Sequence, residues 1–430
     1  MADLKKLAER AIELIKKNSC DGFVRVSSNK KSEFNIEGGE FTLYRTLFDE
    51  NVGVGVYKDT KKGYYQTNKL TEDDIDKAVA AAITSAESSQ PDEGNVLAPC
   101  AGTFNDVQGV YECDQDKLFF RVKELKETLE KDFPLIQIVA IIAQHNAADY
   151  IYATTAGTFS TERFGSYSVT LEIAGHEGDK TSSMVYSGAG TLSLDKPFLD
   201  LADFRFRVDT AIKQLHAEPI EGKFTGTMVL TPGILGMALY SISGMAGGGS
   251  ILDKSSIYLD KLGKKIADER INVTFSVDDE RIIHHPVLTG DGYKAETQDF
   301  IKDGVLNRFS INDYISRKTG FERAKNDSDG MIVRPGDKSL DEIIQGIEKG
   351  ILVGDFSGGQ PAPNGEFSGI AKASFLIENG KVTKALSETM INGNFADMVN
   401  NLRGISKETI EDGWSSLPYM AFDGIVISGK

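Results

Sequence analysis

Histidine is the side chain best suited to metal binding and acid–base chemistry at neutral pH, and this chain has five. His284 and His285 are adjacent in a segment that we expect to be a strand, where adjacent side chains point to opposite faces. Two imidazoles placed in that way cannot easily share one metal ion, and a zinc site needs further converging donors. His176 precedes a glutamate, but Lys180 and Thr181 stand where a second metal-binding histidine would belong. No local motif supplies three ligands and a base.

Serine and glycine motifs do not supply a catalytic template either. Ser357 and Ser368 each lack the upstream glycine of the GxSxG nucleophile turn. Residues 239–250 read LYSISGMAGGGS, in which an apolar segment with helical spacing runs into three glycines. A phosphate-binding P-loop would close on Gly-Lys-Ser/Thr and would open a helix, whereas these glycines follow one. The segment must therefore be understood from the elements around it.

Charge and cysteine content limit the classes of partner. The chain has 430 residues, 64 of them acidic and 48 basic, with a formal net charge of −16. This acidity weighs against direct contact with nucleic acid or an anionic membrane surface, and we expect neither. The three cysteines form no CxxC pair, and charges interrupt the apolar residues of the first 18 positions, so that no signal peptide is predicted. These features predict a cytoplasmic protein.

One uncharged run, Phe224–Leu252, is long enough to cross a bilayer. It contains seven glycines, and Pro232 lies in its first third. A buried strand followed by a buried helix explains the run at least as well as a membrane span. We expect the buried alternative, because spanning helices are richer in large aliphatic residues.

The first half of the chain alternates helices with antiparallel strands. Apolar spacing predicts helices over residues 1–18, 116–132 and 198–218, and Thr71 is placed to cap another over 72–88. Between them, β-branched and alternating runs broken by Gly and Asn/Asp turns predict strands over 22–67 and 135–193. We place a boundary near residue 220 and predict an N-terminal α+β domain over 1–220.

The second half, 221–430, is predicted to be a β-rich domain. It begins with the uncharged strand and helix and continues with strands over 272–283, 300–311, 370–386 and 388–394. Asn379-Gly380 between apolar runs is a hairpin signal, and helices are expected over 339–350 and 394–405. Because helices and strands follow no regular βαβ rhythm, we predict an α+β fold with mainly antiparallel or mixed sheets and packed helices.

Four blocks of this half resemble the TldD/PmbA family, whose members have been described as modulators of DNA gyrase and as peptide-processing metallopeptidases. The blocks are GGGSILDKSSIYLDKLGKKI, TGDGYKAETQDFIKDGVLN, GEFSGIAKASFLIENGKV and ETMINGNFADMVNNL. The resemblance is strong from Phe224 onward and looser in the N-terminal half. It implies the PmbA/TldD-like fold.

The same resemblance implies which branch of the family the chain is similar to. TldD-like members carry an HExxxH zinc helix and a C-terminal cysteine, and ungapped matching puts Leu239, Tyr240 and Gly244 where His, Glu and His would stand. Every cysteine lies before residue 114, and the C-terminal position reads DGWSSLPYM. These are degenerate metal-site positions, typical of the PmbA-like or TldE-like branch. We therefore expect no metal, no cofactor and no catalytic residue in this chain.

By resemblance, the chain is a non-catalytic subunit that assists a TldD-like metallopeptidase, or a second copy of itself, in processing unfolded peptide. Small residues at Gly236, Tyr240, Gly244 and Gly248 would share one helical face and allow close approach of a neighbour. The expected peptide or partner contacts are Gly236, Gly244, Gly247, Gly248, Gly249, Ser250 and the loop from Asp355 to Gly365. Two alternatives stay open: an interaction protein that modulates gyrase or another enzyme without proteolysis, and a hydrolase with an unrecognised site.

Overall fold

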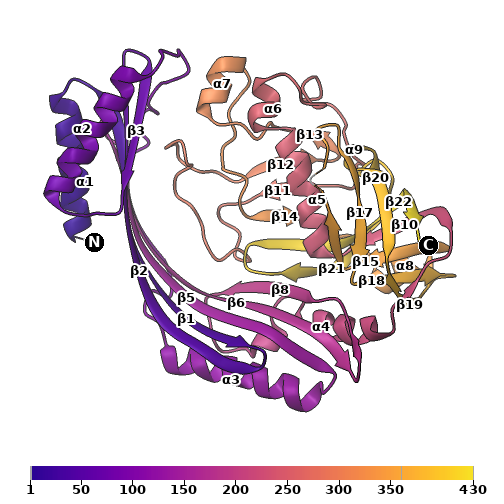
Figure 1. Ribbon diagram of the computed structural model, residues 1–430. Helices are drawn as coiled ribbons and strands as arrows, with labels where there is room; N and C mark the ends of the chain where they lie inside the picture. Colours follow the sequence, from indigo (N-terminus) through magenta and orange to yellow (C-terminus); the bar gives the residue numbers. More distant parts are fainter. Residues whose placement is uncertain (1, 360, 430) are drawn as a thin grey trace.

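The structure, a computed structural model, describes residues 2–359 and 361–429 and contains two large β-sheets (Figure 1). The first sheet has eight strands in the order β3-β2-β1-β5-β6-β4, with β7 and β8 also paired to β6. Its strands are β1 (Asp21–Glu37), β2 (Glu40–Lys58), β3 (Lys61–Thr67), β4 (Thr103–Gly109), β5 (Ile136–Thr154), β6 (Phe159–Glu177), β7 (Lys180–Thr181) and β8 (Val185–Thr191). All neighbours are antiparallel except β4 and β6.

Helices α1 (Ala2–Lys17) and α2 (Glu72–Ser88) cover one end of this sheet. The run Val52-Gly53-Val54-Gly55-Val56 in β2 alternates because successive side chains of a strand point to opposite faces. All three valines are fully buried against residues of the two helices, including Ala11 of α1 and Ile75 of α2. The Thr71 hydroxyl accepts a hydrogen bond from the Asp74 amide at 3.2 Å, which confirms the predicted cap of α2.

Helices α3 (Gln115–Asp132) and α4 (Phe204–Lys213) cover the other end of the same long strands. The predicted helix over 198–218 is wrong in its extent, since only short 3₁₀ turns flank α4. Ala202 has φ +44°, which breaks the helix. The neighbouring Asp203 carboxylate accepts hydrogen bonds from Ser187 and, at 2.7 Å, from Arg207, so local polar contacts replace a helical turn.

The second sheet is mixed and has fourteen strands, with the C-terminal strand β22 pairing with β10, β14, β20 and β21. Parallel pairs join β10 to β15, β14 to β22 and β19 to β9. Its strands are β9 (Glu218–Pro219), β10 (Lys223–Leu230), β11 (Val273–Phe275), β12 (Gln298–Lys302), β13 (Val305–Leu306), β14 (Met331–Val333), β15 (Lys349–Val353), β16 (Asp355–Gly358), β17 (Glu366–Lys372), β18 (Ser374–Glu378), β19 (Lys381–Ser387), β20 (Thr389–Asn394), β21 (Leu402–Glu411) and β22 (Ser415–Ser428). Together with the first sheet, this confirms the predicted α+β class with antiparallel and mixed sheets.

Five helices belong to this half: α5 (Pro232–Met245), α6 (Gly248–Leu252), α7 (Asp313–Thr319), α8 (Leu340–Gln345) and α9 (Phe395–Met398). The hairpin at Asn379-Gly380 is confirmed, with φ +49° and +77°. Predicted spans in this half are wrong in extent at several places. The helix over 339–350 ends at Gln345, because Lys349 begins β15. The strand over 272–283 is limited to β11, and the helix over 394–405 ends at Met398, because Leu402 begins a strand that pairs with β22.

The strands of the two sheets come from residues 21–191 and 218–428 respectively, and the boundary near residue 220 stays a prediction. In Figure 1 the second half lies on the inner side of the curved first sheet. Arg207 of α4 joins the halves, since its guanidinium donates to the Gly354 carbonyl at 2.7 Å.

The uncharged run Phe224–Leu252 forms β10, α5 and α6 instead of one continuous helix. Across the described residues, no helix combines the length and apolar content needed to cross a membrane. Leu235, Leu239 and Ile242 of α5 are buried in the largest core cluster, whereas Met237 and Tyr240 are exposed. The helix is therefore amphipathic in its burial although it carries no charge.

Substituting Leu239, which is 1% exposed, tests this placement. We expect Leu239→Asp to lower the free energy of unfolding by about 3 kcal/mol or more, because an unpaired carboxylate would be buried. Met237→Asp is the matched control on the same helix, since Met237 is 38% exposed; we expect a change within about 0.5 kcal/mol. Urea unfolding measures both, and equal stability of the two variants would show that Leu239 does not lie in the core.

Candidate functional site

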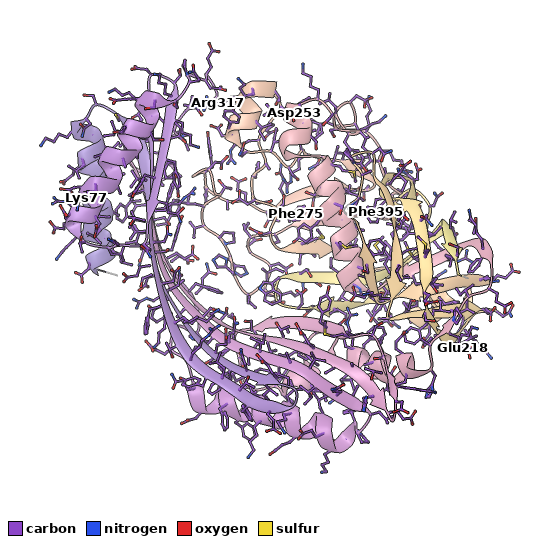
Figure 2. All side chains as sticks on the ribbon, in the orientation of Figure 1. Lys77, Glu218, Asp253, Phe275, Arg317 and Phe395 are labelled. Carbon is purple, nitrogen blue, oxygen red and sulfur yellow. The ribbon has the colours of Figure 1, made fainter. Side chains whose placement is uncertain are left out.

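Helix α5 is the element on which the expected metal-site positions lie. It begins at Pro232 directly after β10, as expected for a proline in the first helical turn, and the Thr231 hydroxyl before it donates to the Gly354 carbonyl at 3.3 Å. The uncharged helix is held by burial of its aliphatic face, and Phe275 of β11 lies beside it (Figure 2). Its outer face carries Met237, Tyr240 and Gly244.

The three degenerate positions do not come together as a ligand set. The Leu239 side chain faces the core, and Tyr240 is 44% exposed with its ring centroid 6.0 Å from that of Phe275. Gly244 faces open space, because a Cβ added there would meet no atom within 4 Å. Desolvation of the Tyr240 phenol beside Phe275 raises its pKa to about 12, further above neutral pH than the ordinary value for tyrosine.

Zinc in proteins is held by thiolate, imidazole and carboxylate ligands, and Leu, Tyr and Gly provide none of them. The residues present on α5 therefore do not fit the ion that the HExxxH helix would hold. Within the described part of the chain, no group of three or more His, Cys, Asp or Glu side chains is arranged to hold a metal ion. The three cysteines, Cys20, Cys100 and Cys113, are free thiols.

Two carboxylates lie close enough to Tyr240 to act on its charge. Burial raises the pKa of both Asp329 and Asp412 above the ordinary value for aspartate. Asp412 also accepts backbone hydrogen bonds from Trp414 at 2.8 Å and Ser415 at 2.6 Å, which oppose the effect of burial. These contacts fix the tight turn before β22, and they give the carboxylate a structural role in shaping the surface beside α5.

His284 and His285 lie in an irregular segment and not in the predicted strand. The His284 imidazole bonds the Glu162 carboxylate of β6. The His285 ring bonds the Asp279 carbonyl at 2.9 Å, and its backbone exchanges two hydrogen bonds with the Gln108 side chain of β4. The two imidazoles thus have separate partners, and the His284 imidazole and the His285 backbone tie the segment to the first sheet.

The glycine positions do not form one continuous helical face, because α5 ends at Met245 and Gly247 is extended, with φ −155°. Gly236 is buried, and a Cβ added there would lie 3.0 Å from Leu417. Close backbone approach occurs at Gly247, where the Gly248 amide donates to the Ser310 carbonyl at 3.1 Å. Gly244 and Gly249 are exposed, and Ser250 lies with Gly249 in α6.

The loop that the sequence singled out begins at Asp355, the first residue of β16, which packs beside α5. Asp355 is buried, and its carboxylate accepts the Phe356 amide at 2.7 Å. Gly365 has φ +88° and lies against Asn394, so a turn requires glycine there. The structure therefore places β16 near α5, and gives Asp355 and Gly365 structural contacts of their own.

Sequence reasoning missed a pocket of 390 Å³ between the first sheet and the loops before and after α7. Aromatic and cationic side chains of β1, β2, β3 and β5 form one wall, and three aspartates lie on the other. The local sequence feature that points to this pocket is the Val-Gly alternation of β2. The pocket itself forms only where residues more than two hundred positions away pack opposite that strand.

Comparisons with known proteins agree with the fold described above. Family models match residues 221–429 as the PmbA/TldA metallopeptidase C-terminal domain and residues 23–86 as the PmbA/TldA metallopeptidase domain 1. The metalloprotease PmbA of Escherichia coli O157:H7 is 24% identical over 98% of this chain and 96% of its own length. A metalloprotease TldD homologue of Buchnera aphidicola is 21% identical over 82% of this chain and 78% of its own length.

Solved structures show the same architecture. A candidate modulator of DNA gyrase from Bacteroides thetaiotaomicron superposes with a TM-score of 0.84 at 24% identity, covering 99% of both chains. TldE from Thermococcus kodakarensis superposes with a TM-score of 0.82 at 20% identity, covering 99% of this chain and 100% of its own. The two family models together span more than half of the residues, and the chain belongs to the PmbA/TldD family of metallopeptidases.

Proposed function

We propose that this chain is the metal-free, PmbA/TldE-like subunit of a peptide-processing metallopeptidase system. One observation carries the proposal: α5 buries Leu239 and presents Tyr240 and Gly244 at positions where a zinc helix needs ligands. Such a chain lacks the Lewis acid and the activated water that a zinc peptidase uses. A TldD-like partner with an intact HExxxH helix supplies them.

In this proposal the metal-free subunit contributes walls and strand edges. Extended peptide is bound by main-chain hydrogen bonds to strand edges, and walls exclude folded proteins. The exposed face of α5, with Met237, Tyr240 and Gly244, is the proposed contact surface for the partner, together with Gly248, Gly249 and Ser250 at the start of α6. The partner is a TldD-like subunit or a second copy of this chain.

The substrate in this proposal is unfolded peptide, and the working compartment is the cytoplasm, in keeping with the three free thiols. The chain is divided near residue 220 into an N-terminal α+β domain and a C-terminal domain that carries α5. The non-proteolytic alternative, modulation of gyrase or another enzyme, would act through a protein surface, since the net charge of −16 disfavours DNA.

Zinc content tests the metal-free part of the proposal. We expect the purified chain to carry no stoichiometric zinc, because no donor stands at Leu239, Tyr240 or Gly244. Elemental analysis measures this, with a TldD-like chain that contains HExxxH purified in parallel as the positive control. One zinc per chain retained after mild chelation would contradict the proposal and would direct attention to His284 and His285.

Activity in the presence of a partner tests the division of labour. The isolated chain should not cleave unfolded peptide, whereas a mixture with the TldD-like chain of the same cell should show cleavage that differs from that of the partner alone. Gly244→Leu should change the activity of the mixture by roughly tenfold, because it places a bulky side chain on the open face of α5. Leucine at this helical position should not lower stability, since glycine is the poorer helix former.

The matched control is Ala80→Leu, at an exposed position of α2 far from α5. Gly248 is unsuitable as the test position, because its φ of +49° would strain any larger residue. Equal effects of Gly244→Leu and Ala80→Leu would remove α5 from the partner surface. Peptide hydrolysis by the isolated chain that resists chelators would overturn the proposal and make this chain a hydrolase in its own right.

A further inference from the structure

The glycines of β2 create the floor of the 390 Å³ pocket. While Val52, Val54 and Val56 face the helices, Gly53 and Gly55 face the pocket, where a Cβ would collide with the Tyr64 hydroxyl and the Phe23 ring respectively. Glycine within a strand costs stability, and it marks places where another group must approach the backbone closely. In β2, the absence of a side chain at Gly53 and Gly55 lets aromatic rings lie against the backbone of the sheet.

Four aromatic rings gather on this floor: Phe23 has its ring centroid 5.9 Å from that of Tyr152 and 6.4 Å from those of Tyr57 and Tyr64. They come from four neighbouring strands, β1, β5, β2 and β3. Tyr64 lies in the same cross-strand row as Phe23, and Tyr57 and Tyr152 lie two residues from that row on the same face. Tyr64 is partly exposed and Tyr152 is buried. The floor therefore offers apolar ring faces, with phenol groups at its edge.

Two cations stand among these rings. The Arg25 guanidinium lies 4.9 Å from the Phe23 centroid and 5.5 Å from that of Tyr152, and it donates to the Gly290 carbonyl of the opposite wall. The Lys62 ammonium lies 5.5 Å from the Tyr57 centroid, and burial together with Arg25 lowers its pKa. Among the described residues, no carboxylate oxygen lies within 4.0 Å of the Lys62 ammonium.

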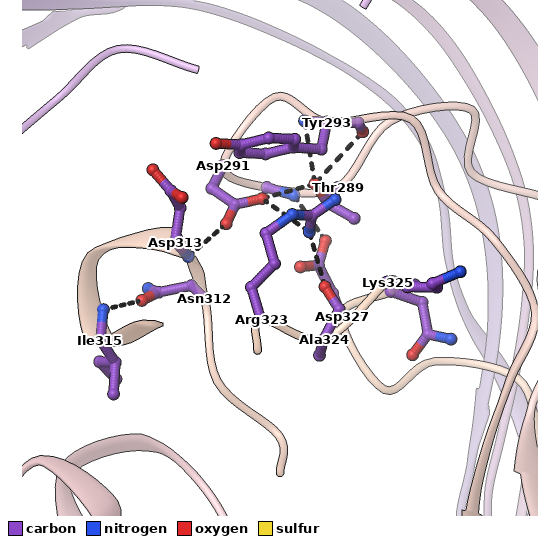
Figure 3. Close-up of polar contacts among 12 residues, drawn as sticks. Thr289, Asp291, Tyr293, Asn312, Asp313, Ile315, Arg323, Ala324, Lys325 and Asp327 are labelled. Atoms are coloured by element: carbon purple, nitrogen blue, oxygen red, sulfur yellow. Dashed lines mark hydrogen bonds and ion pairs between the residues drawn. The ribbon is translucent and has the colours of Figure 1, made fainter. Parts of the chain in front are cut away.

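The opposite wall carries carboxylates, shown in Figure 3. The Asp291 carboxylate accepts hydrogen bonds from the Asp313 amide at 2.7 Å and from the Thr289 hydroxyl. It also lies 3.8 Å from the Arg323 guanidinium. Asp327 accepts only the Gly290 amide, at 2.6 Å, and within the described ranges it has no cationic partner inside 4.0 Å. Burial and the neighbouring Asp291 raise the pKa of Asp327.

The rim holds the two walls at a fixed separation. Asp92 accepts a hydrogen bond from the Tyr314 hydroxyl of α7 at 2.9 Å and pairs with Lys318 at 3.1 Å. The segment that follows, 94–97, lines the pocket beside Tyr314. With the Arg25–Gly290 contact, the pocket is bridged on two sides and remains open between them, so that its volume is available to a ligand.

From these contacts we infer that the pocket binds a short zwitterionic peptide of two or three residues with an aromatic side chain. The carboxylate of the ligand pairs with Lys62, its ammonium pairs with Asp327, and its ring packs on the floor formed by Phe23, Tyr57, Tyr64 and Tyr152. Each charged end of such a ligand meets a charge that has no ionic partner within 4.0 Å among residues 2–359 and 361–429. The volume lies within the range of small-ligand sites.

A nucleotide is the main competitor, since aromatic rings and cations also bind bases and phosphates. The three aspartates opposite Lys62 would repel a phosphate group, which disfavours this class. The inference goes beyond the proposed function, because it concerns binding to this chain alone and requires no zinc partner.

Calorimetric titration of the full chain with the dipeptide Ala-Phe tests the inference. We expect binding that falls about tenfold on N-acetylation of the dipeptide and about tenfold on amidation of its carboxylate, since each removes one charged contact. Lys62→Met should weaken binding of Ala-Phe and leave binding of the amide unchanged. Asp327→Asn should weaken binding of Ala-Phe and leave binding of the N-acetylated dipeptide unchanged.

Lys180→Met, at an exposed position of the β6–β7 hairpin outside the pocket, is the matched control and should bind as the native chain does. The two modified dipeptides test the native chain directly, so the inference stays testable if a variant fails to fold. Absence of Ala-Phe binding, equal affinity for the blocked dipeptides, or tighter binding of AMP than of Ala-Phe would each overturn it. Loss of activity with a zinc partner would bear on the proposed function only.

Discussion

The period-2 alternation of four long antiparallel strands is the constraint on which the rest of the structure depends. β1, β2, β5 and β6 each extend over 17 to 19 residues, or roughly 60 Å. One face of β1 and β5 is buried by α1 and α2 at one end and by α3 and α4 at the other. β2 joins the first of these clusters and β6 joins the second. The opposite face meets the second half of the chain, so a single alternating pattern determines both the core and the pocket.

Local signals in the sequence were sufficient where a few neighbouring residues decide the structure. Thr71 caps α2 through a contact three residues away, and Asn379-Gly380 turns between β18 and β19. Local signals were insufficient where pairing between distant residues decides the structure. β11 is only three residues long, because its neighbours β12 and β14 pair with it over no more than three positions. The pocket could not be predicted, since Arg25 and Gly290 are 265 residues apart.

A catalytic zinc helix combines packing in the core with metal binding, and in helix α5 these two properties are separate. Its place after β10 and its buried aliphatic face depend on residues such as Leu235 and Ile242, which face the core. Metal binding would require ligand side chains at the positions of Leu239, Tyr240 and Gly244. Packing of the helix requires no ligand at any of them. The three positions that the resemblance singled out lie on one helix, and which of them is buried and which is open followed only from the packing.

The pairing of β1 also has a consequence for how the chain is made. One edge of β1 pairs with β2, which follows it directly, whereas the other pairs with β5, so that Ser32 meets His145. During synthesis the hairpin of β1 and β2 emerges long before residues 136–154, and an unpaired strand edge is prone to pair with other chains. After the hairpin ends at Lys58, the ribosome must therefore deliver the 77 residues of 59–135 before β5 begins to cover this edge, so the nascent N-terminal segment is a part of the chain that needs protection by chaperones.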